Sequence, residues 1–143
     1  MKLTQISIFL ENRKGRLYEV CELLGKNDIN IRALTIAETP EFGILRIVVD
    51  KPQKAIDALK KGGFVASLTD IVAVEVSDEP GGLAAILKIF SVNNVNVEYM
   101  YGFVERTSEK ALLVFRFDDP DRAIKLLKKK KIRIVGSDEI RSL

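Results

Sequence analysis

The sequence contains no histidine and no tryptophan, and it has a single cysteine, Cys21. Histidine is the commonest general base and the commonest transition-metal ligand, so its absence argues against most acid–base and metal-dependent enzymes. One cysteine cannot form a disulfide within the chain, which fits a reducing compartment such as the cytoplasm. The acidic residues are scattered, and no Walker or dinucleotide-binding glycine pattern occurs. We therefore expect no catalytic centre, no metal and no cofactor.

Long apolar runs are also missing, because no stretch approaches the roughly 20 residues that a membrane-spanning helix needs. The apolar fraction of 47% and the charged fraction of 30% are typical of a globular protein in water. A net charge of +3 does not indicate a nucleic-acid-binding surface. The 143 residues suffice for one ordinary domain or two small ones. Units of about 70 residues have marginal cores, so we expect two such units to pack together or to oligomerise.

Two tracts of the chain repeat each other in an unbroken register. Residues 11–31 read ENRKGRLYEVCELLGKNDINI, and residues 77–97 read SDEPGGLAAILKIFSVNNVNV. In each tract apolar residues recur at spacings of three and four after a glycine, which predicts a helix that begins just past that glycine. A glycine allows a tight corner and the close approach of a ligand. The free N–H groups of the first helical turn favour an anion such as a carboxylate.

Alternating apolar and polar residues predict strands around these helices and around a second helix in each half. Each half then has the order strand–helix–strand–strand–helix–strand, which is typical of the ferredoxin-like split β-α-β fold. We expect residues 137–143 to form a short tail or a frayed turn. The predicted strands are residues 2–10, 31–37, 42–49, 64–68, 70–76, 97–104, 110–117 and 132–135.

The predicted fold class is therefore α+β. We expect two ferredoxin-like βαββαβ units, residues 1–69 and 70–143, packed side by side, each with an antiparallel sheet and both helices on one face. The junction Ser67-Leu68-Thr69-Asp70 has no glycine- or proline-rich linker, so strand should follow strand directly and limit relative motion of the units.

The loop Asp78-Glu79-Pro80-Gly81-Gly82-Leu83 resembles the signature of ACT domains, the small amino-acid-binding modules attached to many metabolic enzymes. The first copy, ENRKGRL followed by NDINI, is similar but has Lys14 where proline is usual. The resemblance covers nearly the whole chain as two consecutive copies. It implies a regulatory, allosteric module without catalysis, which binds a small amino acid, forms a homodimer and has a regulated metabolic enzyme as a partner.

The resemblance also implies which residues bind the ligand, at an interface between two units. Asn12 in the loop and Asn30 before the second strand match the two asparagines of ACT sites. An amide both donates and accepts hydrogen bonds, which suits the two ends of a zwitterion. Alternatively, Asn12 caps a helix and Asn30 stabilises a turn. The expected ligand-binding residues are Leu10, Asn12, Arg13, Lys14, Gly15, Arg16, Leu17, Asn30, Ile31, Val76, Asp78, Pro80, Gly81, Gly82, Leu83, Asn96 and Val97.

The two copies predict unequal sites. Asp78 replaces Asn12 in the second copy, and a carboxylate there attracts an ammonium group but repels a carboxylate, unless Asp78 is simply a helix N-cap. We therefore expect the better amino-acid site at Asn12 and Asn30. The cations Arg13, Lys14 and Arg16 either attract an anionic ligand or form a solvated loop.

Other features have simpler interpretations. Cys21 lies on an apolar stripe and is expected to be a small core residue. Tyr99, Tyr101 and Phe103 alternate along one strand; they could stack on bases, but a packed face is the favoured interpretation. The run of lysines at residues 128–131 suits a helix C-terminus.

The predicted function is a stand-alone tandem ACT protein that binds a small amino acid in a groove between domains or subunits and acts as a regulatory sensor. One alternative is a ligand-free protein–protein interaction module. A less favoured alternative is a nucleic-acid-binding ferredoxin-like domain. We expect neither a nucleic acid nor a membrane among the partners.

Overall fold

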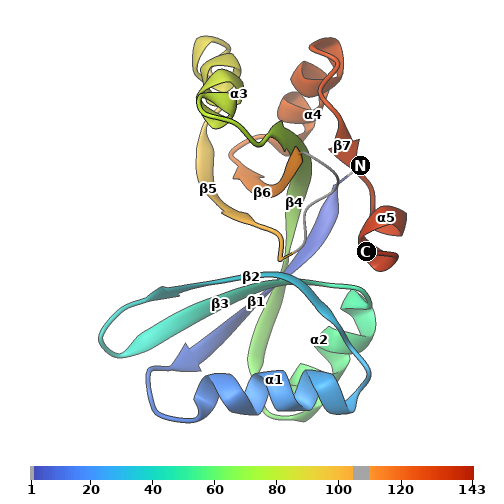
Figure 1. The fold of residues 1–143 in the computed structure, drawn as a ribbon. Coiled ribbons are helices and arrows are strands. Elements are labelled where there is room, and N and C mark those ends of the chain that lie inside the picture. Colours follow the sequence, from blue (N-terminus) through green and yellow to red (C-terminus); the bar gives the residue numbers. More distant parts are fainter. Residues whose placement is uncertain (1, 105–109) are drawn as a thin grey trace. The chain divides into compact units, whose positions relative to one another are not determined.

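The structure, a computed structural model, describes residues 2–104 and 110–143 (Figure 1). The chain divides into two compact units. The N-terminal unit comprises Thr4–Thr69, and the C-terminal unit comprises Asp70–Arg141 together with the first residues of the chain.

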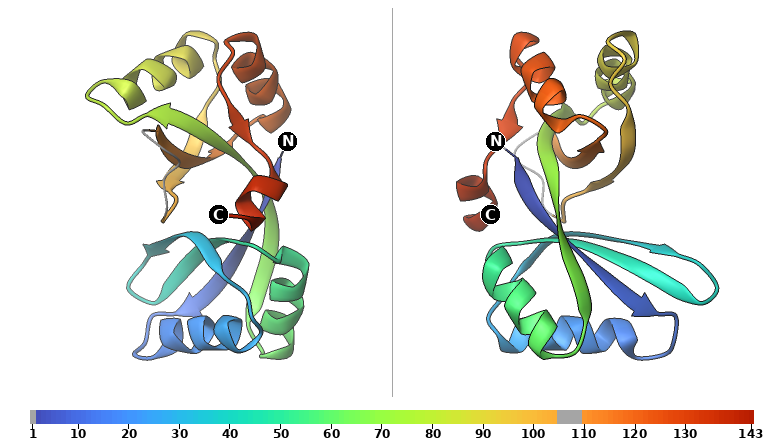
Figure 2. Two further views of the ribbon diagram at one scale, coloured as in Figure 1. Left: turned by 45° about the vertical axis from the view of Figure 1, so that its right-hand side comes forward. Right: turned by 180° about the vertical axis from the view of Figure 1, so that it is seen from behind.

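The N-terminal unit is a sheet with two helices on one face (Figures 1 and 2). The strands follow the order β2-β3-β1-β4. The pairs β1–β3 and β2–β3 are antiparallel. The elements are β1 (Leu3–Glu11), α1 (Arg16–Lys26), β2 (Ile31–Glu38), β3 (Phe42–Val49), α2 (Pro52–Lys61) and the first part of β4 (Val65–Ser77).

The C-terminal unit repeats this plan. Strand β4 lies between β6 and β7, β5 pairs with β6, and all three pairings are antiparallel. The elements that follow β4 are α3 (Gly82–Val92), β5 (Val97–Gly102), β6 (Lys110–Phe117), α4 (Pro120–Lys129), β7 (Ile134–Val135) and α5 (Ser137–Arg141). The predicted α+β class with two ferredoxin-like units is confirmed.

The structure differs from the predicted elements at the junction of the two halves. The predicted strands 64–68 and 70–76 form one continuous strand, β4, which runs from Val65 to Ser77. No glycine or proline interrupts this segment, and its β-branched residues favour extended backbone. The predicted strands 97–104 and 132–135 are shorter, and the predicted turn at 106–109 lies outside the described residues.

The prediction of a tail at residues 137–143 is wrong, because Ser137–Arg141 forms the helix α5. Its Ile140 side chain is only 2% exposed. Burial of one large aliphatic side chain contributes about 1.5–3 kcal/mol, and an ion pair between Arg133 and Glu139 adds a second attachment of the helix to the unit.

Each unit has its own apolar core between the sheet and the helices. In the N-terminal unit, alternate residues of β1 and β3 meet the inner faces of α1 and α2. In the C-terminal unit, the rings of Phe90 and Phe117 meet edge to face with centroids 4.9 Å apart, and Phe115 stacks on Phe117. Cys21, which we expected in the core, is only half-buried and is not among the buried core residues; its partial burial raises the pKa of its thiol.

The repeat is visible in the backbone as well as in the sequence. The glycines that precede the first helix of each unit, Gly15 and Gly81, adopt left-handed φ angles of 86° and 82°. At the other end of each helix the Nδ2 atoms of Asn27 and Asn93 donate to backbone carbonyls four residues earlier, each over 2.8 Å. The same local chemistry therefore starts and ends both helices.

Gly82 has a further structural reason to be glycine. A Cβ atom at this position would lie 2.0 Å from the carbonyl oxygen of Ser77, so the first turn of α3 touches the end of β4. Gly25, near the end of α1, is exposed and a Cβ atom there would meet nothing within 4 Å.

We expect opposite effects from the same substitution at these two glycines. Gly82→Ala should destabilise the protein by about 1–3 kcal/mol, because the backbone must move to accept the methyl group. Gly25→Ala should stabilise it by roughly 0.5–1 kcal/mol through the lower conformational entropy of alanine in the unfolded chain. Urea unfolding of both variants measures the difference; equal effects would contradict the close contact at Gly82.

Candidate functional site

The mouth of α1 contains a hollow of about 170 Å³. The left-handed corner at Gly15 turns the chain from β1 into α1 and leaves space beside the first helical turn. The lining combines apolar, amide and charged side chains, and it comprises Leu10, Glu11, Asn12, Arg13, Arg16, Leu17, Ile36 and Gly43.

Strand pairing brings distant residues to this hollow. In the register of β1 with β3, Leu10 faces Gly43, and in the register of β2 with β3, Ile36 faces Leu45. Glu11, Ile36 and Gly43 were not among the predicted site residues. Ile36 and Gly43 depend on cross-strand register, which the one-dimensional pattern does not specify; Glu11 could have been found from its position between Leu10 and Asn12.

Asn12 does not cap the helix, contrary to the alternative interpretation. The N-cap residue is Gly15, which has no side chain to bond the first turn. Instead, Asn12 Nδ2 donates to the carbonyl oxygens of Thr39 and Pro40, each over 3.2 Å, which holds the loop against the β2–β3 turn. Within the described residues, the amide oxygen of Asn12 accepts no hydrogen bond, so it remains able to accept one from a ligand.

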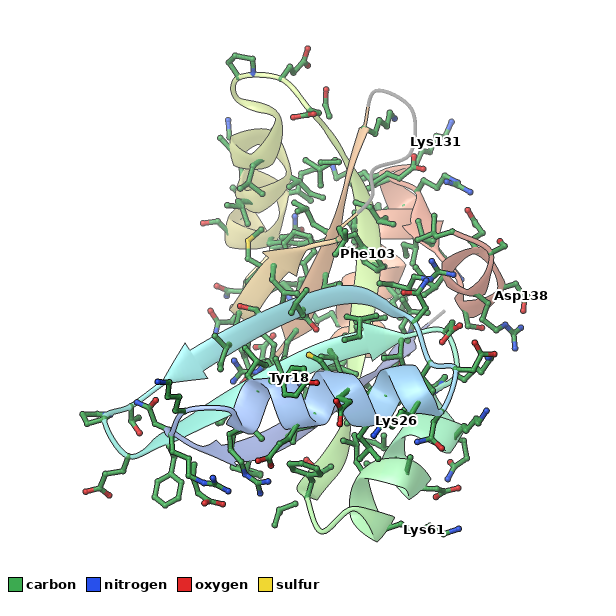
Figure 3. The ribbon with its side chains drawn as sticks, turned by 60° about the horizontal axis from the view of Figure 1, so that its bottom comes forward. Tyr18, Lys26, Lys61, Phe103, Lys131 and Asp138 are labelled. Atoms are coloured by element: carbon green, nitrogen blue, oxygen red, sulfur yellow. The ribbon has the colours of Figure 1, made fainter. Side chains whose placement is uncertain are left out.

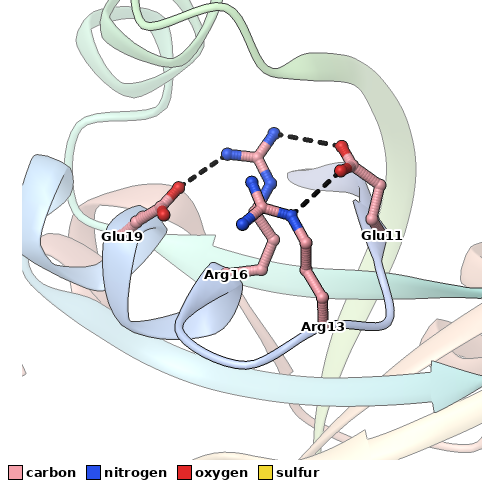
Figure 4. Close-up of polar contacts among 4 residues, drawn as sticks. All are labelled: Glu11, Arg13, Arg16 and Glu19. Carbon is pink, nitrogen blue, oxygen red and sulfur yellow. Dashed lines mark hydrogen bonds and ion pairs between the residues drawn. The ribbon is translucent and has the colours of Figure 1, made fainter.

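A network of arginine and glutamate surrounds the same mouth (Figure 4). Arg16 donates to Glu19 over 2.7 Å and to Glu11 over 3.4 Å, and Arg13 donates to Glu11 over 3.1 Å. The guanidinium carbon of Arg16 also lies 4.4 Å from the ring centroid of Phe64, a favourable cation–π geometry. The Nε atom of Arg16 is buried and has no hydrogen-bond partner among the described residues.

Asn30 lies at the opposite end of α1 from Asn12. The 11 residues of α1 separate them, which corresponds to about 16 Å of helix. Asn30 lines a different hollow, of about 410 Å³, together with Asp28 and Lys51. One unit therefore does not bring the two predicted asparagines into one site.

A reciprocal pair of hydrogen bonds fixes the backbone at Asn30. Its N–H donates to Asp50 Oδ1 over 2.9 Å, and its carbonyl accepts from the Asp50 N–H over 3.2 Å. Asn96 and Asp118 make the same pair of bonds in the C-terminal unit. Ile31 and Val97 follow these asparagines as half-buried first residues of β2 and β5.

The second copy arranges its predicted residues differently. Asp78 is exposed and is not the N-cap, because Gly81 is. Val76 and Gly82 line a hollow of about 320 Å³ on α3. The other predicted residues of this loop lie outside the lining of that hollow; they are Asp78, Pro80, Gly81 and Leu83. In the N-terminal unit, Lys14 and Gly15 likewise lie outside the lining of the hollow at α1.

Two of the aromatic side chains predicted to form a packed face on β5 contact each other. Tyr101 is buried and stacks on Tyr99 with centroids 6.5 Å apart. Residues 2–104 and 110–143 contain no group of three or more acidic, cysteine or histidine side chains that could hold a metal ion. In the same ranges, no helix has the length and apolar character needed to cross a membrane.

Comparison with known families decides the classification. A family model described as an ACT domain pair matches residues 1–143. The chain belongs to the ACT domain family. ACT domains are regulatory units, so the predicted family and the regulatory class are confirmed.

Individual relatives agree with this assignment. The ACT pair is 43% identical to protein BT0572 from Bacteroides thetaiotaomicron, whose crystal structure superposes with a TM-score of 0.94 over 100% of this chain and 98% of that one. It is 31% identical over 102 residues to the acetolactate synthase small subunit of Buchnera aphidicola. That match covers 69% of this chain and 62% of the subunit, so the ACT pair spans less than two thirds of its length.

A further structure shows the fold alone. The regulatory subunit of aspartate kinase from Thermus thermophilus superposes with a TM-score of 0.63 at 19% identity, over 88% of this chain and 91% of that one.

The network at α1 predicts a pH-dependent contribution to stability. The hydrogen bond from Arg13, assisted by the charge of Arg16, lowers the pKa of Glu11 below its ordinary value of 4.5. A carboxyl whose pKa is lower in the folded state stabilises the protein above its unfolded pKa, and this contribution disappears as the pH falls through the folded value. Glu11→Gln should therefore lower the thermal midpoint at pH 7 and should lose this effect in strong acid.

Thermal unfolding between pH 7 and pH 2 measures this difference. Glu41→Gln is the control, because Glu41 lies in an exposed turn and forms no ion pair within the described residues. Its effect at pH 7 should be smaller than that of Glu11→Gln. A difference between wild type and Glu11→Gln that grows as the pH falls would contradict the assigned ion pairs.

Proposed function

We propose that this ACT pair binds a small amino acid at the mouth of α1 and regulates a partner enzyme through the bound state. The observation that carries the proposal is the composition of that hollow. It places the amide oxygen of Asn12, which accepts no hydrogen bond from the described residues, beside the guanidinium groups of Arg13 and Arg16 and beside the aliphatic side chains of Leu17 and Ile36.

These groups match the parts of an amino acid. The amide oxygen of Asn12 can accept from an ammonium group. The arginines supply donors for a carboxylate, and the buried Nε of Arg16 is a donor that lacks a partner among the described residues. The volume of about 170 Å³ is below the range of about 300–1,000 Å³ for drug-sized ligands, which favours a small molecule.

In the proposed site, a second copy of the chain contributes Asn30. The length of α1 keeps Asn30 away from the mouth of its own helix, so a site that uses both asparagines needs Asn12 from one copy and Asn30 from another. A homodimer with the ligand in the groove between subunits satisfies this requirement. A ligand that bridges two copies favours the assembled state, because it binds that state better than the separated one.

The partner in this proposal is an enzyme of amino-acid metabolism. The acetolactate synthase small subunit, with 31% identity, supports a regulatory subunit of this kind. The ACT pair itself carries no catalysis in the proposal.

A ligand-free interaction module is the second candidate. Its support is the exposed aliphatic surface of the edge strand β2, where Leu34 and Ile36 are 42% and 47% exposed. Such an edge can pair with another chain without any small molecule.

A thermal-shift screen with the twenty amino acids tests the main proposal. One or a few small amino acids should stabilise the wild-type protein, by about 2.7 kcal/mol when the free ligand reaches a hundredfold excess over Kd. Asn12→Ala should abolish most of this stabilisation, because it removes the ammonium acceptor. No stabilisation by any amino acid would favour the ligand-free module instead.

A mixing experiment separates a site within one copy from a site between copies. Asn12→Ala and Asn30→Ala should each abolish binding on their own if the ligand bridges two copies. Mixed dimers of these two variants should regain about half of the wild-type stoichiometry in calorimetry, because one groove of each mixed dimer has both asparagines. If Asn30→Ala alone binds normally, the site lies within one copy at α1.

A further inference from the structure

The C-terminal unit contains a second hollow, of about 320 Å³, at the first two turns of α3. The segment that joins α4 to β7 forms its opposite wall, and Lys131 projects from that segment (Figure 3). This hollow is separate from the mouth of α1, and it lies wholly within residues 75–133. Its lining comprises Glu75, Val76, Ser77, Gly82, Ala85, Ile86, Ile89, Lys110, Lys131, Ile132 and Arg133.

The repeat shows which side chains differ between the units at this position. Gly82 and Ala85 occupy the positions that Arg16 and Glu19 occupy in the N-terminal unit. There, the Arg16 side chain is only 17% exposed, pairs with Glu19 and covers the ring of Phe64. The C-terminal unit thus has two small residues where the N-terminal unit has two long, ion-paired side chains.

The opposite wall corresponds between the units as well. Phe64 N–H donates to Leu59 O over 3.0 Å, and Ile132 N–H donates to Leu127 O over 3.0 Å. The residues before them, Gly63 and Lys131, both have positive φ angles. Ile132 therefore stands at the position of Phe64, and without an arginine over it this aliphatic surface faces the hollow.

The side chains of the hollow divide by chemistry. Ile86, Ile89 and Ile132 supply aliphatic walls. The rim carries three cations, Lys110, Lys131 and Arg133, against one carboxylate, Glu75. Glu75 is paired with Arg133, which also pairs with Glu139. The excess of positive charge on the lining favours an anion, and the aliphatic walls favour a ligand with an apolar body.

We propose that this hollow binds a short aliphatic monocarboxylate, with the chain of the ligand against the isoleucines and its carboxylate at Lys110 and Lys131. The volume of about 320 Å³ lies at the lower end of the range for small-molecule sites, about 300–1,000 Å³. An amine of the same shape carries a positive charge, which the cations of the rim repel. An inorganic anion has no apolar body to cover the aliphatic walls, so these walls stay exposed to water and the gain from their burial is lost.

Three probes test the ligand chemistry by ¹⁵N NMR titration of the full chain. 4-Methylpentanoate should bind saturably and shift the amide resonances of α3 and of residues 131–133. 3-Methylbutylamine, which has the same branched body and a cationic head, should cause no saturable shift there, and neither should inorganic phosphate. Saturable binding of the amine at these residues, or no binding of the carboxylate, would overturn the proposal.

Two tyrosine substitutions on α3 provide a matched pair. Ala85 lines the hollow and Ala84 does not; both are exposed, and Tyr18 of the N-terminal unit occupies the position of Ala84. Ala85→Tyr should fill the hollow and weaken 4-methylpentanoate binding at least about tenfold, whereas Ala84→Tyr should leave it within about twofold. Equal weakening by both variants would contradict the assigned location.

A charge substitution supplies an independent check. Lys131→Asn removes a cation of the rim, and asparagine tolerates the positive φ angle of this position. It should weaken binding of the carboxylate, and Lys130→Gln, outside the lining, should not. Asn12→Ala should leave this binding unchanged, which separates the hollow on α3 from the amino-acid site proposed at α1. Loss of carboxylate binding in Asn12→Ala would overturn the assignment to α3.

Discussion

The left-handed backbone corner at Gly15 and at Gly81 is the constraint on which both units depend. A positive φ angle at these positions turns the chain from an inner strand directly into a helix. A residue with a Cβ atom would be strained there. The corner fixes where the first helical turn stands relative to the end of the strand. It thereby places Asn12, Arg13 and Arg16 around one hollow in the N-terminal unit.

The two units share this backbone but use it for different chemistry. Where the N-terminal unit has Arg16 and Glu19, the C-terminal unit has Gly82 and Ala85. The long pair covers Phe64 and forms an ion-pair network with Glu11. The small pair exposes an aliphatic wall beneath a rim of cations. The accessible hollows described in the two units therefore have different linings, although both lie beside the helix that follows the glycine corner.

Much of the fold could be predicted because the sequence repeats. Apolar spacing identified the helices and most strands, and the glycine–asparagine pattern identified their ends. The helix α5 was missed because five residues are too few for a periodic signal, and its stability comes from the burial of Ile140. The continuity of β4 was missed because each half was compared with its own repeat, which ends at the junction.

The candidate site could be predicted only in part. The loop pattern placed Asn12 and Arg16 at the helix mouth, where they lie. Ile36 and Gly43 reach the hollow through strand pairing, and the bonds of Asn12 to Thr39 and Pro40 depend on how the β2–β3 turn folds back. Such contacts join residues nearly 30 positions apart, so a local pattern does not contain them.

The reciprocal hydrogen bonds between Asn30 and Asp50 have a mechanical consequence. They join the entrance of β2 to the residue just before α2 begins, and the same joint recurs between Asn96 and Asp118. A molecule that contacts either asparagine is therefore separated from the start of the second helix by only one pair of hydrogen bonds. Within each unit, these bonds couple the connection that enters the second strand to the connection that enters the second helix.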